Sequence, residues 1–211
     1  METIKKNIAL LSTAYLGPVE YYYYLLKFDR VIIEQHETWP KQTYRNRTVI
    51  TTDKGTIPFT IPVKKVNGNN TKTSDIVISN HEKWHVKHWK AMETNYNNSP
   101  YFLYYADEIK ELLFSQTSSL ILLNTKLTEL VCELMGIQTN ISLSTSFVKK
   151  PDSDVLDLRN KISPKLPPTL SHFPKYTQVF FDKQPFFPNV SVLDLLFCLG
   201  PDSKSYLDRL K

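Results

Sequence analysis

An apolar run followed by a helix and a second apolar run opens this chain and sets its fold class. Asn7 to Thr13 is continuous apolar sequence, the pattern of a strand covered on both faces. Pro18 suits the start of a helix over Val19 to Phe28, and Val31 to Gln35 is a short β-branched strand. Strand, loop, helix and strand in this order predict a βαβ unit, and therefore an open α/β sheet.

Ligands in such sheets bind where strands end and helices begin. Tyr15 and Gly17 lie in the first of these loops, and Gln35 lies at the end of the second strand, beside Glu34 and His36. We therefore predict that Tyr15, Gly17 and Gln35 contact a substrate. Ordinary loop polarity is an equally good explanation for Glu34 and His36.

The stretch from Trp39 to Arg47 concentrates cationic and aromatic side chains directly before the next predicted strand. Arginine offers five donors in a planar fork that matches phosphate and carboxylate, and lysine adds a point charge. The alternative is a solvated basic strand edge that discourages aggregation. The residues predicted here to bind an anionic substrate are Lys41, Tyr44, Arg45, Asn46 and Arg47.

The remaining pattern predicts further strands and helices. Thr48–Thr52 and Ile57–Val63 flank Asp53-Lys54-Gly55 as a β-hairpin, and the prolines Pro58 and Pro62 favour a sheet edge. The other predicted elements are a strand over 75–79, helices over 81–96 (capped by Asn80), 101–115 and 118–135, a strand over 137–147 and a helix over 190–199. Asn124 lies beside the apolar face of the third helix, as a buried bonded amide or as a ligand contact.

Together these elements predict an α/β fold of three layers with a mixed sheet, a Rossmann-like βαβ opening and an edge β-hairpin. At 211 residues the chain fits one domain, 1–211. Five of its 13 prolines lie in 149–175, which predicts an extended, poorly packed connection. Residues 176–211 regain apolar density and are expected to form a C-terminal helical segment packed on the core.

Composition narrows the classes of function. A net charge of +5 is modest and dispersed, which disfavours a dedicated nucleic-acid binder, and the two common glycine-rich phosphate loops are absent. Cys132 and Cys198 lie in apolar helical patterns and are expected to be buried thiols. The apolar run after Lys5 and Lys6 is too short for a signal peptide or a membrane span, so a cytoplasmic location is expected.

His81-Glu82-Lys83-Trp84-His85 matches the H-E-x-x-H pattern of zinc peptidases, and His88 follows on the same predicted helix face. The motif lies at the predicted start of a helix, carries a lysine inside it and lacks the spacing of a third ligand. We therefore expect no metal site, and nothing in the sequence indicates another cofactor.

Several separated segments together resemble the WbqC-like protein family. They are Tyr15-Leu16-Gly17-Pro18, Asp29-Arg30-Val31, the stretch 41–47, Ile61-Pro62-Val63, Trp84-x-x-Lys87-His88, Tyr96-x-x-Ser99-Pro100-Tyr101-Phe102, Asn124, Leu134-x-Gly136-Ile137 and the segment 189–196. One segment departs: the family often begins with a His-Gln-Pro loop where this chain has Leu11-Ser12-Thr13-Ala14.

The resemblance implies a transferase linked to O-antigen and related surface-polysaccharide biosynthesis, moving an acyl, glycyl or related group onto an amino sugar. Lys41, Asn46, Arg47, Lys87 and His88 fall on matching positions. We expect His88 to be the general acid/base and Lys87 a second catalytic residue. The expected partner is a small anionic or nucleotide-activated substrate, with no membrane and no nucleic acid. A non-catalytic module that binds an acidic sugar or polymer is the alternative.

Overall fold

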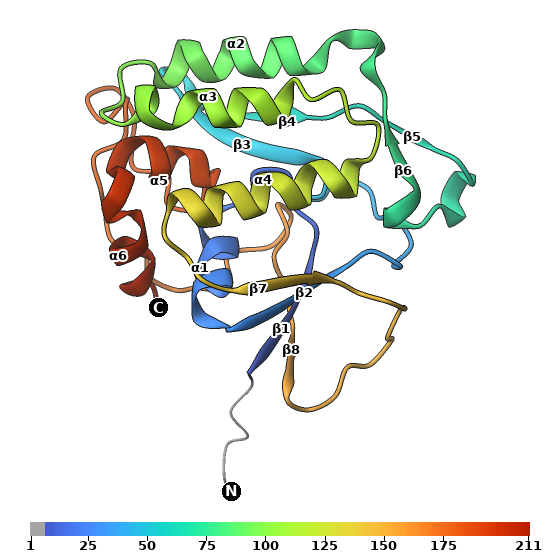
Figure 1. The fold of residues 1–211 in the computed structure, drawn as a ribbon. Coiled ribbons are helices and arrows are strands. Elements are labelled where there is room, and N and C mark those ends of the chain that lie inside the picture. The colour runs from blue at the N-terminus through green and yellow to red at the C-terminus, as the bar shows by residue number, and fades with distance from the viewer. Residues whose placement is uncertain (1–6) are drawn as a thin grey trace, which may run out of the picture.

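The computed structural model describes residues 7–211, so Lys5, Lys6 and the rest of 1–6 lie outside it (Figure 1). Its centre is a sheet of four parallel strands in the order β7-β2-β1-β8. These strands are β1 (Ile8–Ser12), β2 (Arg30–Glu34), β7 (Asn140–Leu143) and β8 (Val155–Asp157). The predicted α/β class is confirmed. The predicted mixed sheet is corrected, because the antiparallel strands form separate small sheets.

The predicted βαβ opening is confirmed by β1, α1 (Val19–Lys27) and β2. β1 and β2 pair in parallel from Ile8 opposite Arg30 to Ser12 opposite Glu34. The middle of β1 is buried, as expected for an apolar strand whose two faces are both covered.

Two antiparallel pairs lie outside the parallel sheet. β3 (Arg47–Thr52) pairs with β4 (Gly55–Thr60), and β5 (Val63–Lys65) pairs with β6 (Ile76–Ile78). The predicted hairpin is therefore confirmed, but as a sheet of its own. This suits Pro58, which has no N–H to donate to a further strand.

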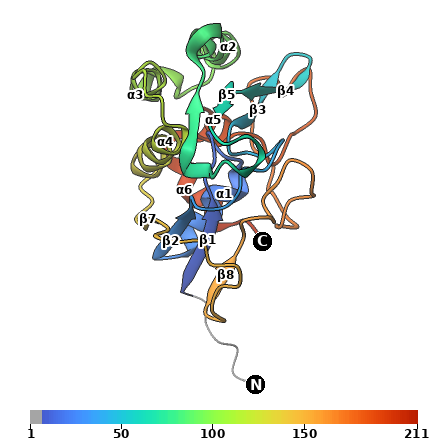
Figure 2. The same cartoon turned by 90° about the vertical axis from the view of Figure 1, so that its right-hand side faces the viewer.

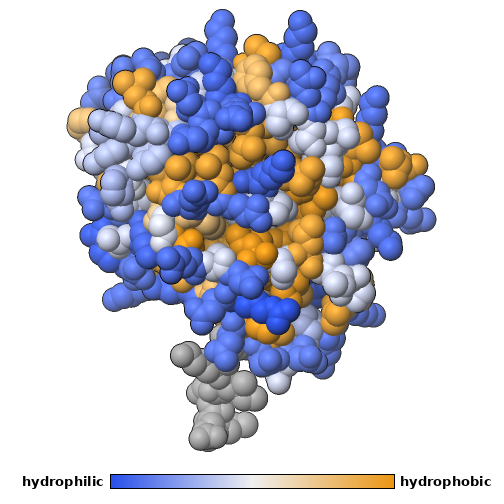
Figure 3. Space-filling view, in the orientation of Figure 1, coloured by the Kyte–Doolittle hydropathy of each residue, from blue (hydrophilic) through white to orange (hydrophobic). Residues whose placement is uncertain are grey.

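Five α-helices complete the described part of the chain, and none of them is long and apolar enough to cross a membrane. They are α2 (Trp84–Tyr96), α3 (Phe102–Leu113), α4 (Leu120–Leu134), α5 (Val192–Leu199) and α6 (Ser203–Asp208). In Figures 1 and 2, α4 lies between α3 and the parallel sheet, and α2 lies farthest from that sheet. On the face in Figure 3, apolar surface is broken up by polar side chains.

Three predicted boundaries are corrected. The helix expected from His81 begins at Trp84, because residues 80–82 form a 3-10 turn and Lys83 adopts φ 48°. The strand expected over 137–147 is shortened to β7. The proline-rich segment 149–175, expected to be a poorly packed connection, contains β8, an edge strand that pairs with β1.

Gly200 ends α5 in a conformation that only glycine adopts without strain. Its φ is +54°, and a Cβ placed there would lie 2.5 Å from the Tyr101 ring. We expect Gly200→Ala to lower the free energy of unfolding by about 3 kcal/mol, from backbone strain plus overpacking. Gly136→Ala is the matched control: its φ is +66° but nothing lies within 4 Å, so the expected loss is about 1 kcal/mol. Equal losses in urea unfolding would contradict the role of the Tyr101 contact.

Candidate functional site

The carboxyl ends of β1 and β8 mark the place where the chain reverses its direction across the sheet. From β1 the chain continues to β2 on one side, whereas β8 is added later on the other side. In open parallel sheets, such a switch point is the usual position of a ligand. We therefore begin with the polar side chains that converge there.

Arg45 reaches the switch point from the loop before β3 and is 3% exposed. Its Nε and Nη2 donate to the two carboxylate oxygens of Glu37, at 2.8 and 2.7 Å, and Nη2 also donates to Ser12 Oγ. This is a bidentate, charge-assisted pair with a fixed geometry. The hydrogen bonds among the described residues leave Nη1 of Arg45 without an acceptor.

Arg159 approaches the same point from β8 and is 5% exposed. Its Nε and Nη2 donate to Asp157 at 3.0 and 2.7 Å, and its Nη1 donates to the Val148 carbonyl at 2.9 Å and to Glu34 at 3.4 Å. Ser12 lies between the two arginines, because its Oγ donates to the Arg159 carbonyl at 2.9 Å.

A small cavity lies between these side chains, which we call the switch-point cavity. Its lining residues are Leu11, Ser12, Thr13, Ala14, Tyr21, Tyr44, Arg45, Leu158, Arg159 and Ile162. The volume is about 10 Å³, room for one water molecule. The cavity in this conformation therefore admits only a small part of a ligand.

The charges around the cavity nearly cancel. Two guanidinium groups, Arg45 and Arg159, face three carboxylates, Glu34, Glu37 and Asp157. Burial raises the pKa of Glu37, even though the adjacent Arg45 opposes that shift, whereas hydrogen bonds from Arg159 lower the pKa of Asp157. Burial also raises the pKa of Tyr44 to about 12, so its hydroxyl stays protonated. Glu37 thus combines a raised pKa with direct contact to Arg45.

Asn124 holds two walls of the cavity together from α4. Its Nδ2 donates to the Arg45 carbonyl at 2.7 Å and to Thr13 Oγ1 at 3.1 Å. Its Oδ1 is buried without a hydrogen-bond partner among the described residues. The side chain therefore positions Arg45, and its place beside the apolar helix face, seen in the sequence, is explained.

The end of β2 is tied to the end of β7 rather than open to a ligand. The Gln35 side-chain amide donates to the Ser144 carbonyl at 2.8 Å, and the Gln35 N–H donates to Ser144 Oγ at 3.1 Å. Ser144 Oγ in turn donates to Glu34 at 2.8 Å. The contact between Gln35 and a substrate remains a prediction.

His88 and Tyr15 form a buried pair that does not line the switch-point cavity. The Tyr15 hydroxyl lies 3.0 Å from His88 Nδ1, and the His88 ring stacks on Phe59 with ring centres 4.9 Å apart. Burial lowers the pKa of His88 to about 4, so the ring is neutral at pH 7. His88 is only 6% exposed and joins α2 to β4 and to the loop after β1.

The other predicted site residues are dispersed. Lys87 is exposed and lies 3.6 Å from Glu82, and Lys41 is also exposed. Arg47 Nε donates to Thr60 Oγ1 at 3.2 Å, Asn46 Nδ2 donates to the Ile61 carbonyl at 2.8 Å, and the Gly17 carbonyl accepts from Val192 at 2.9 Å. Of the predicted residues, the switch-point cavity therefore unites Tyr44 and Arg45, with Asn124 behind them.

The H-E-x-x-H residues do not share one site. His81 Nδ1 lies 2.7 Å from Ser79 Oγ, His85 packs edge-on against Phe114, and His88 is buried beside Tyr15. Within residues 7–211, no group of three or more His, Cys, Asp or Glu side chains is arranged to hold a metal ion.

Four residues that make hydrogen bonds in and around the site were not predicted from the sequence as site residues: Ser12, Glu37, Ser144 and Arg159. Ser12 lies within the predicted first strand, and Arg159 lies in the proline-rich segment that the sequence predicts to be a connection. The apolar Val155-Leu156 pair just before Arg159 is too short to identify a strand from the sequence alone.

Comparison with known proteins agrees with the resemblance seen in the sequence. The model of the WbqC-like protein family matches residues 13–166, more than half of the chain. An uncharacterized protein of Mycobacterium tuberculosis (strain ATCC 25618 / H37Rv), Rv1507c, is 28% identical over 227 aligned residues, which cover 96% of this chain and 97% of that protein. No solved structure matches this chain. The chain therefore belongs to the WbqC-like protein family.

Proposed function

We propose that this protein is a transferase that moves an acyl, glycyl or related group onto an amino sugar in surface-polysaccharide biosynthesis. Its substrate carries a phosphate or another anion, and the reaction takes place at the switch-point cavity. The observation that carries this proposal is the convergence of two buried guanidinium groups, Arg45 and Arg159, on one cavity at the switch point of the sheet.

Arg45 is the residue best placed to hold the anion. Among the described residues, no hydrogen-bond acceptor contacts Nη1 of Arg45, so this nitrogen can donate to a ligand. The hydrogen bond from Asn124 to the Arg45 carbonyl holds the backbone in place. A phosphate competes with Glu37 for the guanidinium, and the raised pKa of Glu37 favours its protonation once it is displaced. The segment from Leu11 to Ala14, at the end of β1, where the family often carries His-Gln-Pro, forms one wall of the same cavity.

His88 acts in this proposal through Tyr15. A neutral imidazole beside the Tyr15 hydroxyl fixes the loop that follows β1, and this loop leads into the cavity wall. The low pKa and the burial of His88 favour this positioning role over proton exchange with solvent. A catalytic role for Lys87, on the exposed side of α2, remains a prediction that rests on family position alone.

A binding screen tests the proposed site. The probes are nucleoside diphosphate sugars, acyl-coenzyme A and plain oligosaccharides, measured by thermal shift and then by calorimetry. We expect a phosphate-bearing probe to bind and Arg45→Lys to weaken it about tenfold or more, because lysine cannot reproduce the bidentate fork. Arg47→Lys makes the same exchange two residues away and is expected to change affinity less than twofold.

The pH dependence of that affinity gives a second measurement. When the anion displaces Glu37 from Arg45, the pKa of Glu37 rises, so the complex binds more protons than the free protein. Affinity is therefore expected to increase as pH falls through the pKa of Glu37 in the complex, by up to about tenfold per pH unit, and to lose this dependence in Glu37→Gln. If Arg47→Lys abolishes binding and Arg45→Lys does not, the proposed placement is wrong. Binding of acidic oligosaccharides without turnover supports the non-catalytic module instead.

A further inference from the structure

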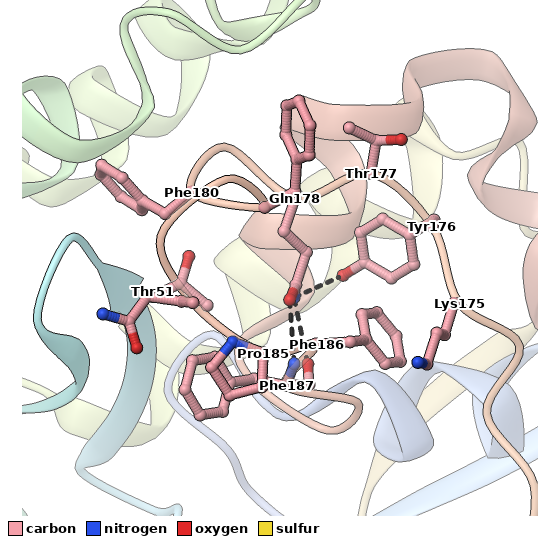
Figure 4. Close-up of a pocket in the computed structure, with 11 residues that line it drawn as sticks. Thr51, Lys175, Tyr176, Thr177, Gln178, Phe180, Pro185, Phe186 and Phe187 are labelled. Atoms are coloured by element: carbon pink, nitrogen blue, oxygen red, sulfur yellow. Dashed lines mark hydrogen bonds between the residues drawn. The ribbon is translucent and has the colours of Figure 1, made fainter.

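A larger cavity lies beside α5, formed by the loop before that helix and by the end of β3 (Figure 4). Its volume is about 420 Å³, within the range of cavities that hold small-molecule ligands. The lining residues are Thr51, Lys175, Tyr176, Thr177, Gln178, Phe180, Phe181, Gln184, Pro185, Phe186 and Phe187. They share no member with the switch-point cavity, and we call this second one the aromatic cavity.

The floor of the aromatic cavity is held by a buried carboxylate. Asp194 accepts hydrogen bonds from Tyr176 and Thr51, both at 2.6 Å, and from Gln178 at 2.8 Å. Gln178 also exchanges two hydrogen bonds with the Phe187 backbone, at 2.9 and 3.0 Å, and Figure 4 shows this pairing. The shape of the cavity is therefore fixed by a buried network rather than by a loose loop.

The hydrogen bonds already made by the polar lining residues indicate which groups a ligand must offer. The hydroxyl protons of Thr51 and Tyr176 are used on Asp194, and the Gln184 amide N–H donates to the Asp53 carbonyl at 2.7 Å. The oxygens of these side chains keep lone pairs and can accept N–H groups of a ligand.

The aromatic cavity also has one charged side chain and several aromatic rings in its lining. Lys175 is the one charged residue of the lining, which calls for an anionic group. In Figure 4, Lys175 lies on the same side as Tyr176 and Phe186, and Thr51 and Phe180 lie on the opposite side. Five of the lining residues are aromatic and supply faces on which a planar ring can stack.

We propose that the aromatic cavity binds a nucleoside monophosphate with an amino-substituted base. The base stacks among the phenylalanine rings with its exocyclic amine toward Thr51 and Gln184, and the phosphate lies at Lys175. This inference does not depend on the proposed transferase activity, because it concerns different residues.

Calorimetry of the full chain with adenosine monophosphate tests the proposal. We expect saturable binding that Lys175→Ala weakens about tenfold, through loss of the phosphate contact, while Lys183→Ala has no effect. Lys183 is exposed on the same loop but outside the lining, so it is a matched control. Phe186→Leu keeps apolar volume but removes a stacking face, and is expected to weaken binding about fivefold to tenfold.

Inosine monophosphate, which has an oxygen where adenosine monophosphate has the amine, is expected to bind about tenfold more weakly, because the Thr51 oxygen, whose hydroxyl proton is used on Asp194, then faces another acceptor. Arg45→Lys is expected to leave this binding unchanged, which separates it from the switch-point cavity. The proposal is overturned if adenosine monophosphate does not bind, if Lys183→Ala weakens binding as much as Lys175→Ala, or if galacturonate binds more tightly. Affinity that grows with the length of oligoadenylate likewise overturns it in favour of a polymer site.

Discussion

Asp194→Ala is expected to lower the free energy of unfolding by about 3–5 kcal/mol, because it removes the common acceptor of several buried donors. The carboxylate is fully buried at the start of α5 and accepts from Thr51, Tyr96, Tyr176 and Gln178. Urea unfolding followed by circular dichroism measures the loss.

Asp194→Asn provides a graded second variant. Asparagine keeps the shape and one acceptor oxygen but places an N–H₂ group against donors, so about half of the loss is expected. Asp182→Ala is the exposed control and should change stability by no more than about 0.5 kcal/mol. A loss below 1 kcal/mol for Asp194→Ala would falsify the view that this carboxylate organises the C-terminal segment.

Burial raises the pKa of Asp194, so the effect of its replacement on the free energy of unfolding depends on pH. Since the folded pKa lies above the unfolded value, the wild type loses stability as pH rises from the unfolded pKa through the folded pKa. Asp194→Asn lacks this titration. Its stability relative to the wild type is therefore expected to be poorest at low pH and to improve as pH rises through that window.

The second large effect is expected at the buried ion pair of the switch-point cavity. Arg45→Met leaves the Glu37 carboxylate buried without its partner, which costs about 3–5 kcal/mol. Arg45→Met combined with Glu37→Met removes the stranded charge and is expected to recover most of this loss. The coupling energy from the double-mutant cycle should therefore be large, and Arg47→Met is the control for removing an arginine from the same stretch.

The sign of the pH effect is a further check on this variant. Burial already raises the pKa of Glu37, and loss of Arg45 raises it more. A carboxyl whose folded pKa is raised loses stabilising free energy as pH rises through that pKa, so Arg45→Met should be less destabilised at pH 5 than at pH 8. A coupling energy near zero, or a loss independent of pH, contradicts an ion-pair role for Arg45.

Local pattern was enough for the elements that are defined by neighbouring residues. The apolar run of β1, the glycine turn between β3 and β4 and the 3.6-residue periodicity of α4 all appear in short windows. β8 could not be found in this way, because three half-buried residues carry no alternation and gain their structure only by pairing with β1. For the same reason, the sequence pattern does not show that the antiparallel strands form sheets of their own, because this too depends on which strands pair.

The sequence shows which stretch is rich in basic residues, but it does not show which of their side chains point into the site. The basic stretch contains both Lys41, which is exposed, and Arg45, which is buried, and a loop has no period that tells the two apart. The partner of Arg45 is likewise set by tertiary structure, since Glu37 lies in irregular sequence before it. The position of Arg159 at the cavity could not be predicted either, because it depends on the pairing of β8 with β1.

The pairing of β1 with β8 also governs when the fold can close during synthesis. Ile8 pairs with Val155, so most of the chain must leave the ribosome before the first strand has neighbours on both edges. Until then, an apolar strand edge stays open to other chains, and non-local parallel pairing is slow to form. The nascent chain therefore carries its greatest aggregation hazard at its beginning and loses it only when the proline-rich segment emerges.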